Sequence, residues 1–150
     1  MKQQRLAILA GIRTPFVKSG GEFKEIPAYD LARLAMREVL DRSGIDAELV
    51  DEVILGNVAQ PAEAANIARV SALLAGLHER TPAVTVHRNC ASGMESVTTA
   101  YERLLAGQGK LILAGGAENM SRIPLFYPQS FSDKMVAVQR AKKFGAKISA

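Results

Sequence analysis

Residues 83–106, AVTVHRNCASGMESVTTAYERLLA, contain the change of pattern that decides the fold. Residues 83–87 form a short apolar, β-branched run typical of a buried strand, and from residue 91 the apolar positions recur at helical spacing. A strand that turns directly into a helix is the repeating unit of α/β proteins. We therefore expect a strand over 83–87, a helix over 91–106, and a sharp elbow between them.

Strand-like and helix-like segments alternate on both sides of this elbow. The alternation predicts an α/β fold with a mostly parallel sheet. Apolar runs predict further strands over 6–10, 50–59 and 110–114. Periodic apolar positions predict further helices over 28–43, 63–76 and, with a basic character, 132–144.

The helices also carry predictions about burial. The helix over 91–106 has few charges, so we expect it to be covered on several sides, and the Ala- and Leu-rich helix over 63–76 to be buried or to lie in an interface. In the helix over 28–43, we expect one apolar stripe formed by Leu31, Leu34, Ala35 and Val39.

Composition excludes several classes of protein. The chain has 150 residues, of which 48% are hydrophobic and 23% charged, as in ordinary globular domains. It contains no apolar run of about 18 residues, so we expect no membrane span. The N-terminal apolar stretch is short and is better explained as a strand than as a signal peptide, so we expect no export.

Cysteine and histidine are scarce. Cys90 is the single cysteine, so no internal disulfide can form, and a reducing compartment such as the cytoplasm is expected. His78 and His87 are the two histidines, too few with one cysteine for a closed zinc site, so we expect no metal.

The net charge of +4 is localised. Residues 1–130 contain 14 basic and 14 acidic residues, whereas residues 131–150 contain five basic residues and one acidic residue. The basic pI therefore reflects a local surface near the C-terminus and does not predict a nucleic-acid partner for the rest of the chain.

Cys90 is the residue best placed for chemistry. At a strand-to-helix elbow its thiol is accessible, and the small residues 91–93 let a ligand approach. The N–H groups of the first helical turn favour a thiolate and could stabilise an oxyanion. Alternatively, a lone cysteine is a small buried hydrophobe. No base is evident: the direction of His87 is open, and His78 lies in a loop after the second helix.

Four segments, in order, resemble the thiolase family across residues 5–121. RTPF (13–16) is similar to its N-terminal signature, and GNV with ANIAR (56–69) to the segment of its dimer contact. NCASGMES (89–96) resembles the nucleophile segment, and AGGAENMS (114–121) the Gly-Gly segment that closes the N-terminal half.

The resemblance implies a fold and an activity. The fold is the thiolase N-terminal α/β half over 1–121, a mixed, mostly parallel sheet with helices on both faces, followed by the start of a loop domain over 122–150. Cys90 would attack the 3-keto carbon of a 3-ketoacyl-CoA, releasing acetyl-CoA and leaving an acyl-cysteine that a second CoA accepts; the reverse is a Claisen condensation. Coenzyme A thioesters are then substrates, with no bound cofactor. The resemblance also implies a homodimer or tetramer in the full-length parent, with a fatty-acid oxidation subunit as a partner.

The chain also departs from the family pattern. It has no second cysteine and no Gly-His-Pro segment, which supply the acid/base and the catalytic histidine in the C-terminal half of thiolases. We therefore expect an incomplete fragment that is inactive alone and has an uncovered apolar surface. The alternatives are a non-catalytic folded remnant acting as an interaction module and, on the basic tail alone, a nucleic-acid binder.

Overall fold

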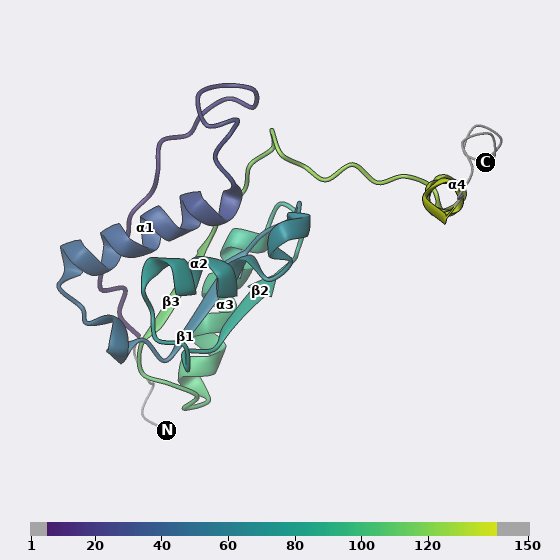
Figure 1. The fold of residues 1–150 in the computed structure, drawn as a ribbon. Helices are drawn as coiled ribbons and strands as arrows, with labels where there is room; N and C mark the ends of the chain where they lie inside the picture. Colours follow the sequence, from purple (N-terminus) through teal and green to yellow (C-terminus); the bar gives the residue numbers. More distant parts are fainter. Residues whose placement is uncertain (1–5, 141–150) are drawn as a thin grey trace.

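The structure, a computed structural model, describes residues 6–140 (Figure 1). The α-helices are α1 (Ala28–Ser43), α2 (Ile67–Ala75), α3 (Ser92–Leu105) and α4 (Gln129–Arg140). The strands are β1 (Glu52–Gly56), β2 (Ala83–Val86) and β3 (Ile112–Gly116). Two short 3-10 helices, η1 (Ala47–Leu49) and η2 (Ala62–Ala64), precede β1 and α2.

The described strands form one parallel sheet in the order β2-β1-β3. Both α1 and α2 pack on the face that carries Val53 and Leu55, and α3 packs against β1 and β3 on the other face. The expected α/β fold with helices on both sides of a parallel sheet is confirmed. The strand predicted over 50–59 is shorter in the structure, where it is β1 (52–56). The strand predicted over 110–114 lies two residues later, as β3 (112–116).

Asp51 joins the beginnings of the two strands β1 and β3. Its carboxylate accepts the N–H groups of Lys110 at 2.6 Å and Leu111 at 3.0 Å. Because these bonds favour the ionised form, they lower the pKa of Asp51 below its ordinary value of 3.8. The N–H of Asp51 donates in turn to the carbonyl of Leu111 at 2.9 Å, which fixes the register of the two strands.

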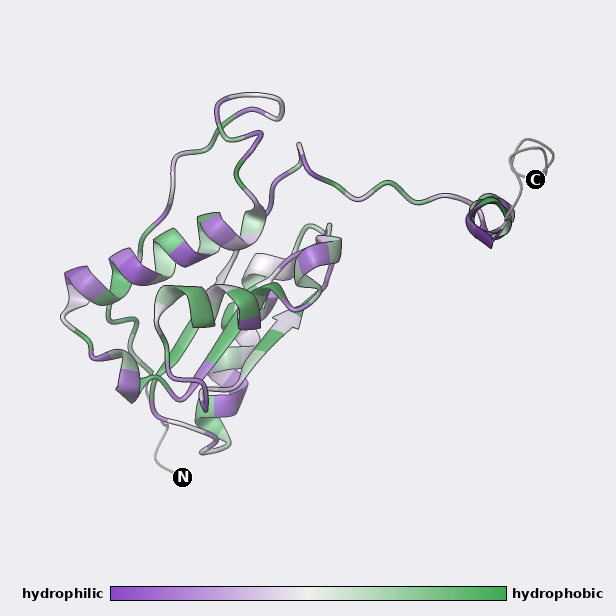
Figure 2. Ribbon diagram, viewed as in Figure 1, coloured by the Kyte–Doolittle hydropathy of each residue, from purple (hydrophilic) through white to green (hydrophobic). Residues whose placement is uncertain are grey.

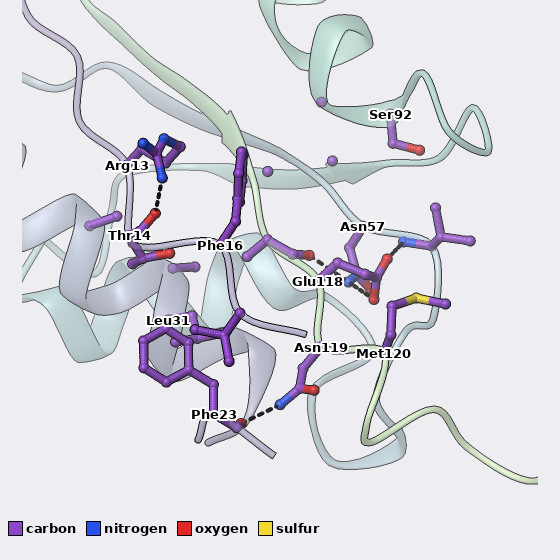
Figure 3. A pocket seen from close by; sticks show the side chains of 18 of the residues that line it. Arg13, Thr14, Phe16, Phe23, Leu31, Asn57, Ser92, Glu118, Asn119 and Met120 are labelled. Carbon is purple, nitrogen blue, oxygen red and sulfur yellow. Dashed lines mark hydrogen bonds between the residues drawn. The ribbon is translucent and has the colours of Figure 1, made fainter. Parts of the chain in front are cut away.

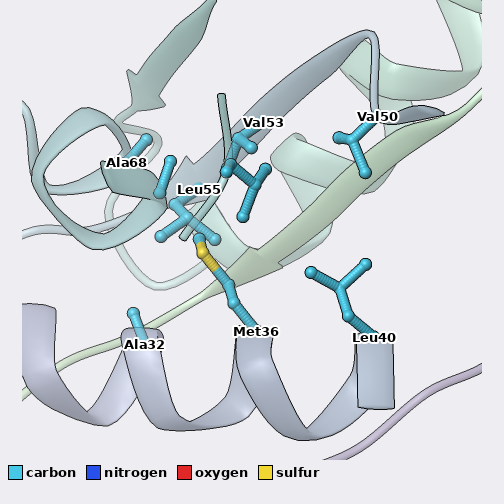
Figure 4. Packing of buried hydrophobic residues seen from close by; sticks show 9 residues of the cluster. Ala32, Met36, Leu40, Val50, Val53, Leu55 and Ala68 are labelled. Carbon is cyan, nitrogen blue, oxygen red and sulfur yellow. The ribbon is translucent and has the colours of Figure 1, made fainter. Parts of the chain in front are cut away.

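The core lies between α1, α2 and β1 (Figure 4). Figure 4 shows Met36 reaching from α1 toward Leu55 of β1, and Leu40, one turn further along α1, on the side of Val50. The buried stripe of α1 has a spacing of four: Ala28, Ala32, Met36 and Leu40. The predicted stripe of Leu31, Leu34, Ala35 and Val39 lies beside the buried one: Val39 packs against the core, whereas Leu34 is 46% exposed. The prediction was therefore wrong about which residues form the centre of the buried face.

The helix expected over 63–76 is divided in two. Asn66 separates η2 from α2 and caps α2, because its side chain accepts the N–H of Arg69 at 3.1 Å. Figure 2 shows that α2 is hydrophobic over most of its surface, yet only the face with Ile67, Ala68, Ser71 and Ala72 is buried. Leu73 and Leu74 remain about half exposed.

α3 approaches the sheet through small residues. Its buried positions are Ser92, Ser96 and Ala100, and the Ser96 hydroxyl donates to the carbonyl of Gly93 at 2.7 Å. The expectation that this helix is covered on several sides was wrong for the described residues. Its larger apolar side chains are exposed: Met94, Val97, Tyr101 and Leu105. The small side chains of Ser92, Ser96 and Ala100 let α3 pack closer to the sheet than its bulky apolar side chains would. The Ser96 hydroxyl can be buried there because its hydrogen bond is made within the helix.

The predicted strand over 6–10 is absent. These residues form no strand, and Ile8 is 91% exposed. No strand in the described part of the chain pairs with this segment, so its backbone forms no sheet hydrogen bonds there although its side chains are apolar.

The basic helix expected over 132–144 begins earlier, as α4. Figure 1 shows α4 at the end of an extended segment, away from the sheet. Lys134 and Arg140 lie on it, whereas residues 141–144 are outside the described residues. Among helices within 6–140, none combines the length and apolar character needed to cross a membrane.

Gly56 is expected to be the least replaceable residue of the sheet. A Cβ on Gly56 would overlap the backbone carbonyl of Ser92, so Gly56→Ala must push α3 away from β1. We expect a loss of roughly 1–3 kcal/mol in the free energy of unfolding, measured by urea denaturation. Gly115→Ala is the matched control, because its Cβ would meet only Leu55 Cδ2 at 3.6 Å. Equal stability of the two variants would contradict the close approach.

Candidate active site

Cys90 lies at the elbow between β2 and α3, as the sequence predicts. β2 ends at Val86 and α3 begins at Ser92, with Ala91 at the N-cap position. Asn89, directly before the cysteine, has a positive φ of 47°, a conformation that asparagine tolerates better than most residues. The thiol is free and exposed, so Cys90 is not the small buried hydrophobe of the alternative reading.

Ser92 fixes the shape of the elbow from inside. Its hydroxyl accepts the N–H of Arg88 at 2.8 Å and donates to the carbonyl of Asn89 at 2.7 Å. The side chain of Arg88 makes an ion pair with Glu95 at 2.8 Å, one turn into α3. The backbone on both sides of Cys90 is therefore tied to the first turn of the helix.

That first turn offers hydrogen-bond donors. Glu95 N–H donates to the carbonyl of Ala91, so the N–H groups of Gly93 and Met94 come before the first intrahelical donor and have no acceptor within the helix. Ala91 has no side-chain oxygen that could cap them. Their N–H groups are available to a negatively charged atom at the end of the helix.

Cys90 lines a cavity of about 1090 Å³ at the carboxyl ends of the strands. Figure 3 shows other residues that line the same cavity. Its other walls come from residues 12–19, the first two turns of α1, and the segments that follow β1 and β3. Openings of this size accept small-molecule ligands, and the carboxyl ends of parallel strands are where α/β proteins bind them. Two further lining residues, Arg13 and Phe16, form a cation–π pair at 4.5 Å.

Two polar residues after β3 hold the neighbouring loops. Figure 3 shows Glu118 directed toward Asn57 and Asn119 directed toward the backbone of Phe23. Asn119 is buried and donates to the carbonyls of Phe23 at 2.9 Å and Ile26 at 2.6 Å. Both residues belong to the AGGAENMS segment (114–121), but the sequence pattern alone predicted no role for either of them. Their position directly after a parallel strand is the signal that could have found them.

Neither histidine lies among the described residues that line the Cys90 cavity. His87 lines a separate hollow of about 380 Å³ with Met120 and Phe126. His78 lies before β2, at the opposite end of the sheet, and its Nδ1 accepts the N–H of Arg80 at 2.9 Å. Within residues 6–140, no group of three or more His, Cys, Asp or Glu side chains could hold a metal ion.

Comparisons with known proteins agree with one another. The family model described as Thiolase, N-terminal domain, matches residues 6–148. A probable acetyl-CoA acyltransferase of Staphylococcus aureus is 41% identical over 132 residues, covering 87% of this chain and 34% of the relative. Its counterpart from Staphylococcus epidermidis is 37% identical over 150 residues, covering 93% of this chain and 38% of the relative.

A solved structure is also similar. The crystal structure of the Bacillus anthracis acetyl-CoA acetyltransferase has a TM-score of 0.78 and 36% sequence identity, covering 81% of this chain and 31% of that chain. The present chain thus spans about a third of the length of these proteins.

Removal of the Ser92 hydroxyl is expected to loosen the elbow. Ser92→Ala leaves the Arg88 N–H and the Asn89 carbonyl without that partner, and Ser92 is only 4% exposed. We expect a loss of about 1–3 kcal/mol in the free energy of unfolding, measured by urea denaturation. Thr98→Ala, on the exposed side of the same helix, should change it by less than about 0.5 kcal/mol. A Ser92→Ala variant as stable as the control would show that the hydroxyl does not hold the elbow.

Proposed function

Because this chain belongs to the thiolase family, whose N-terminal domain it carries, we propose that the protein is a thiolase-type acyltransferase with Cys90 as its nucleophile. Its substrates are coenzyme A thioesters: a 3-ketoacyl-CoA and free CoA in the degradative direction, or two acyl-CoA molecules in the condensing direction. The observation that carries the proposal is the free, exposed thiol of Cys90 on the wall of the cavity, in a chain whose family match includes that segment.

The reaction proceeds in two transfers. The Cys90 thiolate attacks the 3-keto carbon, and the bond between C2 and C3 breaks, with its electron pair moving to C2. Protonation of C2 releases acetyl-CoA, and the shortened acyl group stays on sulfur as a thioester. The thiol of a second CoA gives up its proton, attacks this thioester and regenerates the Cys90 thiolate.

The elbow supports the first transfer in two ways. Its hydrogen bonds and the Arg88–Glu95 ion pair hold the cysteine backbone at one place relative to α3. The N–H groups of Gly93 and Met94 come before the first intrahelical donor, Glu95, and favour negative charge at this end of α3. Pre-oriented donors of this kind stabilise a thiolate and the oxyanion formed from an attacked carbonyl.

Complete turnover also needs proton-transferring groups beside the cavity. Among the described residues that line the cavity, Glu118 is the one carboxylate, and its oxygens already accept N–H groups of residues 57–59. We propose that the proton-transferring cysteine and histidine lie outside these 150 residues, and that this chain alone does not turn over. The exposed apolar face of α3 is then where the remainder of the protein packs.

We also propose a domain organisation, a location and an assembly for this protein. Residues 1–121 form the N-terminal core and 122–150 begin the loop domain. A cytoplasmic location fits a chain with one cysteine. A role in fatty-acid metabolism and assembly as a homodimer or tetramer are proposed from the family alone. A fatty-acid oxidation subunit is the partner that such an enzyme would have.

The nucleophile can be tested in the complete gene product. Incubation with acetyl-CoA, followed by proteolysis and peptide mass analysis, should find an added acetyl group on the peptide that contains Cys90. Cys90→Ser should abolish the label and lower thiolysis of acetoacetyl-CoA by roughly three orders of magnitude or more. Glu102→Gln, an exposed change on the same helix, should keep both. Full turnover in Cys90→Ser would reject the assignment.

A further inference from the structure

We propose that Glu118 is a positioning residue for this reaction: its carboxylate holds the loop of residues 57–60, of which Asn57 and Val58 line the Cys90 cavity, in the shape that binds the acyl-CoA. The inference rests on the proposed function and adds to it a residue that does not itself touch the reacting atoms. Glu118 follows β3, the loop follows β1, and both segments line the cavity.

The carboxylate accepts three N–H groups from one short stretch of chain. The backbone N–H of Val58 donates to Oε2 at 2.8 Å, and that of Ala59 donates to the same oxygen at 3.3 Å. The side-chain amide of Asn57 donates to Oε1 at 3.1 Å. Hydrogen bonds to an ionised acceptor are about twice as strong as those between neutral groups, so this contact restrains the loop strongly.

Asn57 completes the restraint. It is only 1% exposed, its amide also donates to the carbonyl of Ala117 at 2.8 Å, and its side-chain oxygen accepts the N–H of Gln60 at 2.8 Å. The N–H of Asn57 itself donates to the carbonyl of Val86 at 3.2 Å. Each backbone N–H from residue 57 to residue 60 therefore has an acceptor, and Glu118 or Asn57 supplies three of the four.

The loop needs such support because its conformation is not favourable by itself. Gln60 has a positive φ of 30°, which is uncommon for a residue with a side chain. Val58 is 42% exposed, so little apolar burial holds it in place. Loss of the carboxylate would free the loop to relax, while the core between α1, α2 and β1 would keep its contacts.

Glutamine cannot fully replace this group. A carboxylate has two oxygens and accepts on both, whereas a glutamine amide has one oxygen and an NH₂ group that only donates. In Glu118→Gln, the NH₂ group would face either the Asn57 amide or the backbone N–H groups of Val58 and Ala59. Glu118→Gln keeps part of the contact and Glu118→Ala removes all of it.

The kinetic effect should fall on KM. A cavity wall contacts bound substrate and transition state alike, so its displacement raises KM and leaves kcat nearly unchanged. A purely structural role would instead reduce the fraction of folded enzyme, which lowers kcat per total protein and leaves KM unaltered. The two roles are therefore distinguished by which constant changes.

The test uses the complete gene product with acetoacetyl-CoA and CoA. In Glu118→Gln we expect KM for acetoacetyl-CoA to rise about threefold to tenfold, the factor that corresponds to one lost hydrogen bond. It should rise further in Glu118→Ala, with kcat within twofold of wild type in both. Amide hydrogen exchange, measured by NMR or mass spectrometry, should become faster at residues 58 and 59. Glu102→Gln is the control for loss of a glutamate charge, since Glu102 is exposed on α3.

Two results would overturn the inference. One is a wild-type KM in both Glu118 variants, and the other is unchanged exchange at residues 58 and 59. If Glu118→Ala fails to fold, the nearly isosteric Glu118→Gln decides alone. Failure of the proposed function is a separate result, since wild-type protein would then leave Cys90 unacylated, and the exchange measurement would still report whether Glu118 holds the loop.

Discussion

The backbone of α3 packs directly against the backbone of the sheet, and the site depends on this close approach. Gly56 lies against the Ser92 carbonyl, and a Cβ on Gly116 would come within 3.3 Å of Gly93 Cα. Side chains at these positions would force helix and sheet apart, as overpacking does in any close-packed interior. Because the elbow is continuous with α3, the distance between helix and strands also determines where Cys90 lies relative to the ends of β1 and β3.

The segment after β3 organises the rest of the site. Glu118 and Asn119 are consecutive, and Figure 3 shows their side chains directed toward different parts of the chain. One accepts donors from the loop after β1, and the other donates to carbonyls of the turn before α1. In residues 6–140, no buried side-chain nitrogen or oxygen lacks a hydrogen-bond partner. A fully satisfied polar network specifies one arrangement of the cavity walls, since any alternative would leave buried donors or acceptors unpaired.

Much of the fold could be predicted from the sequence, and two of the failures have a common cause. The order of the elements, the end of α1 before Gly44 and the elbow at Cys90 are local properties of chain chemistry. Two apolar surfaces are exposed: the segment 6–10, and the face of α3 that carries Met94, Val97 and Tyr101. An apolar pattern indicates that a surface is to be buried, but it does not identify the surface that covers it, and this chain spans only about a third of its relatives.

For the candidate site, the sequence alone determined that Cys90 follows a strand, precedes a helix and has small neighbours, because strand, turn and helix are set by residues close in the chain. Only the tertiary structure decided that the side of α3 with Ser92 and Ser96 meets the sheet, and that Glu118 holds a loop sixty residues earlier. Such pairings depend on the order and register of the strands. These arise from contacts between distant segments, and no local pattern of residues encodes them.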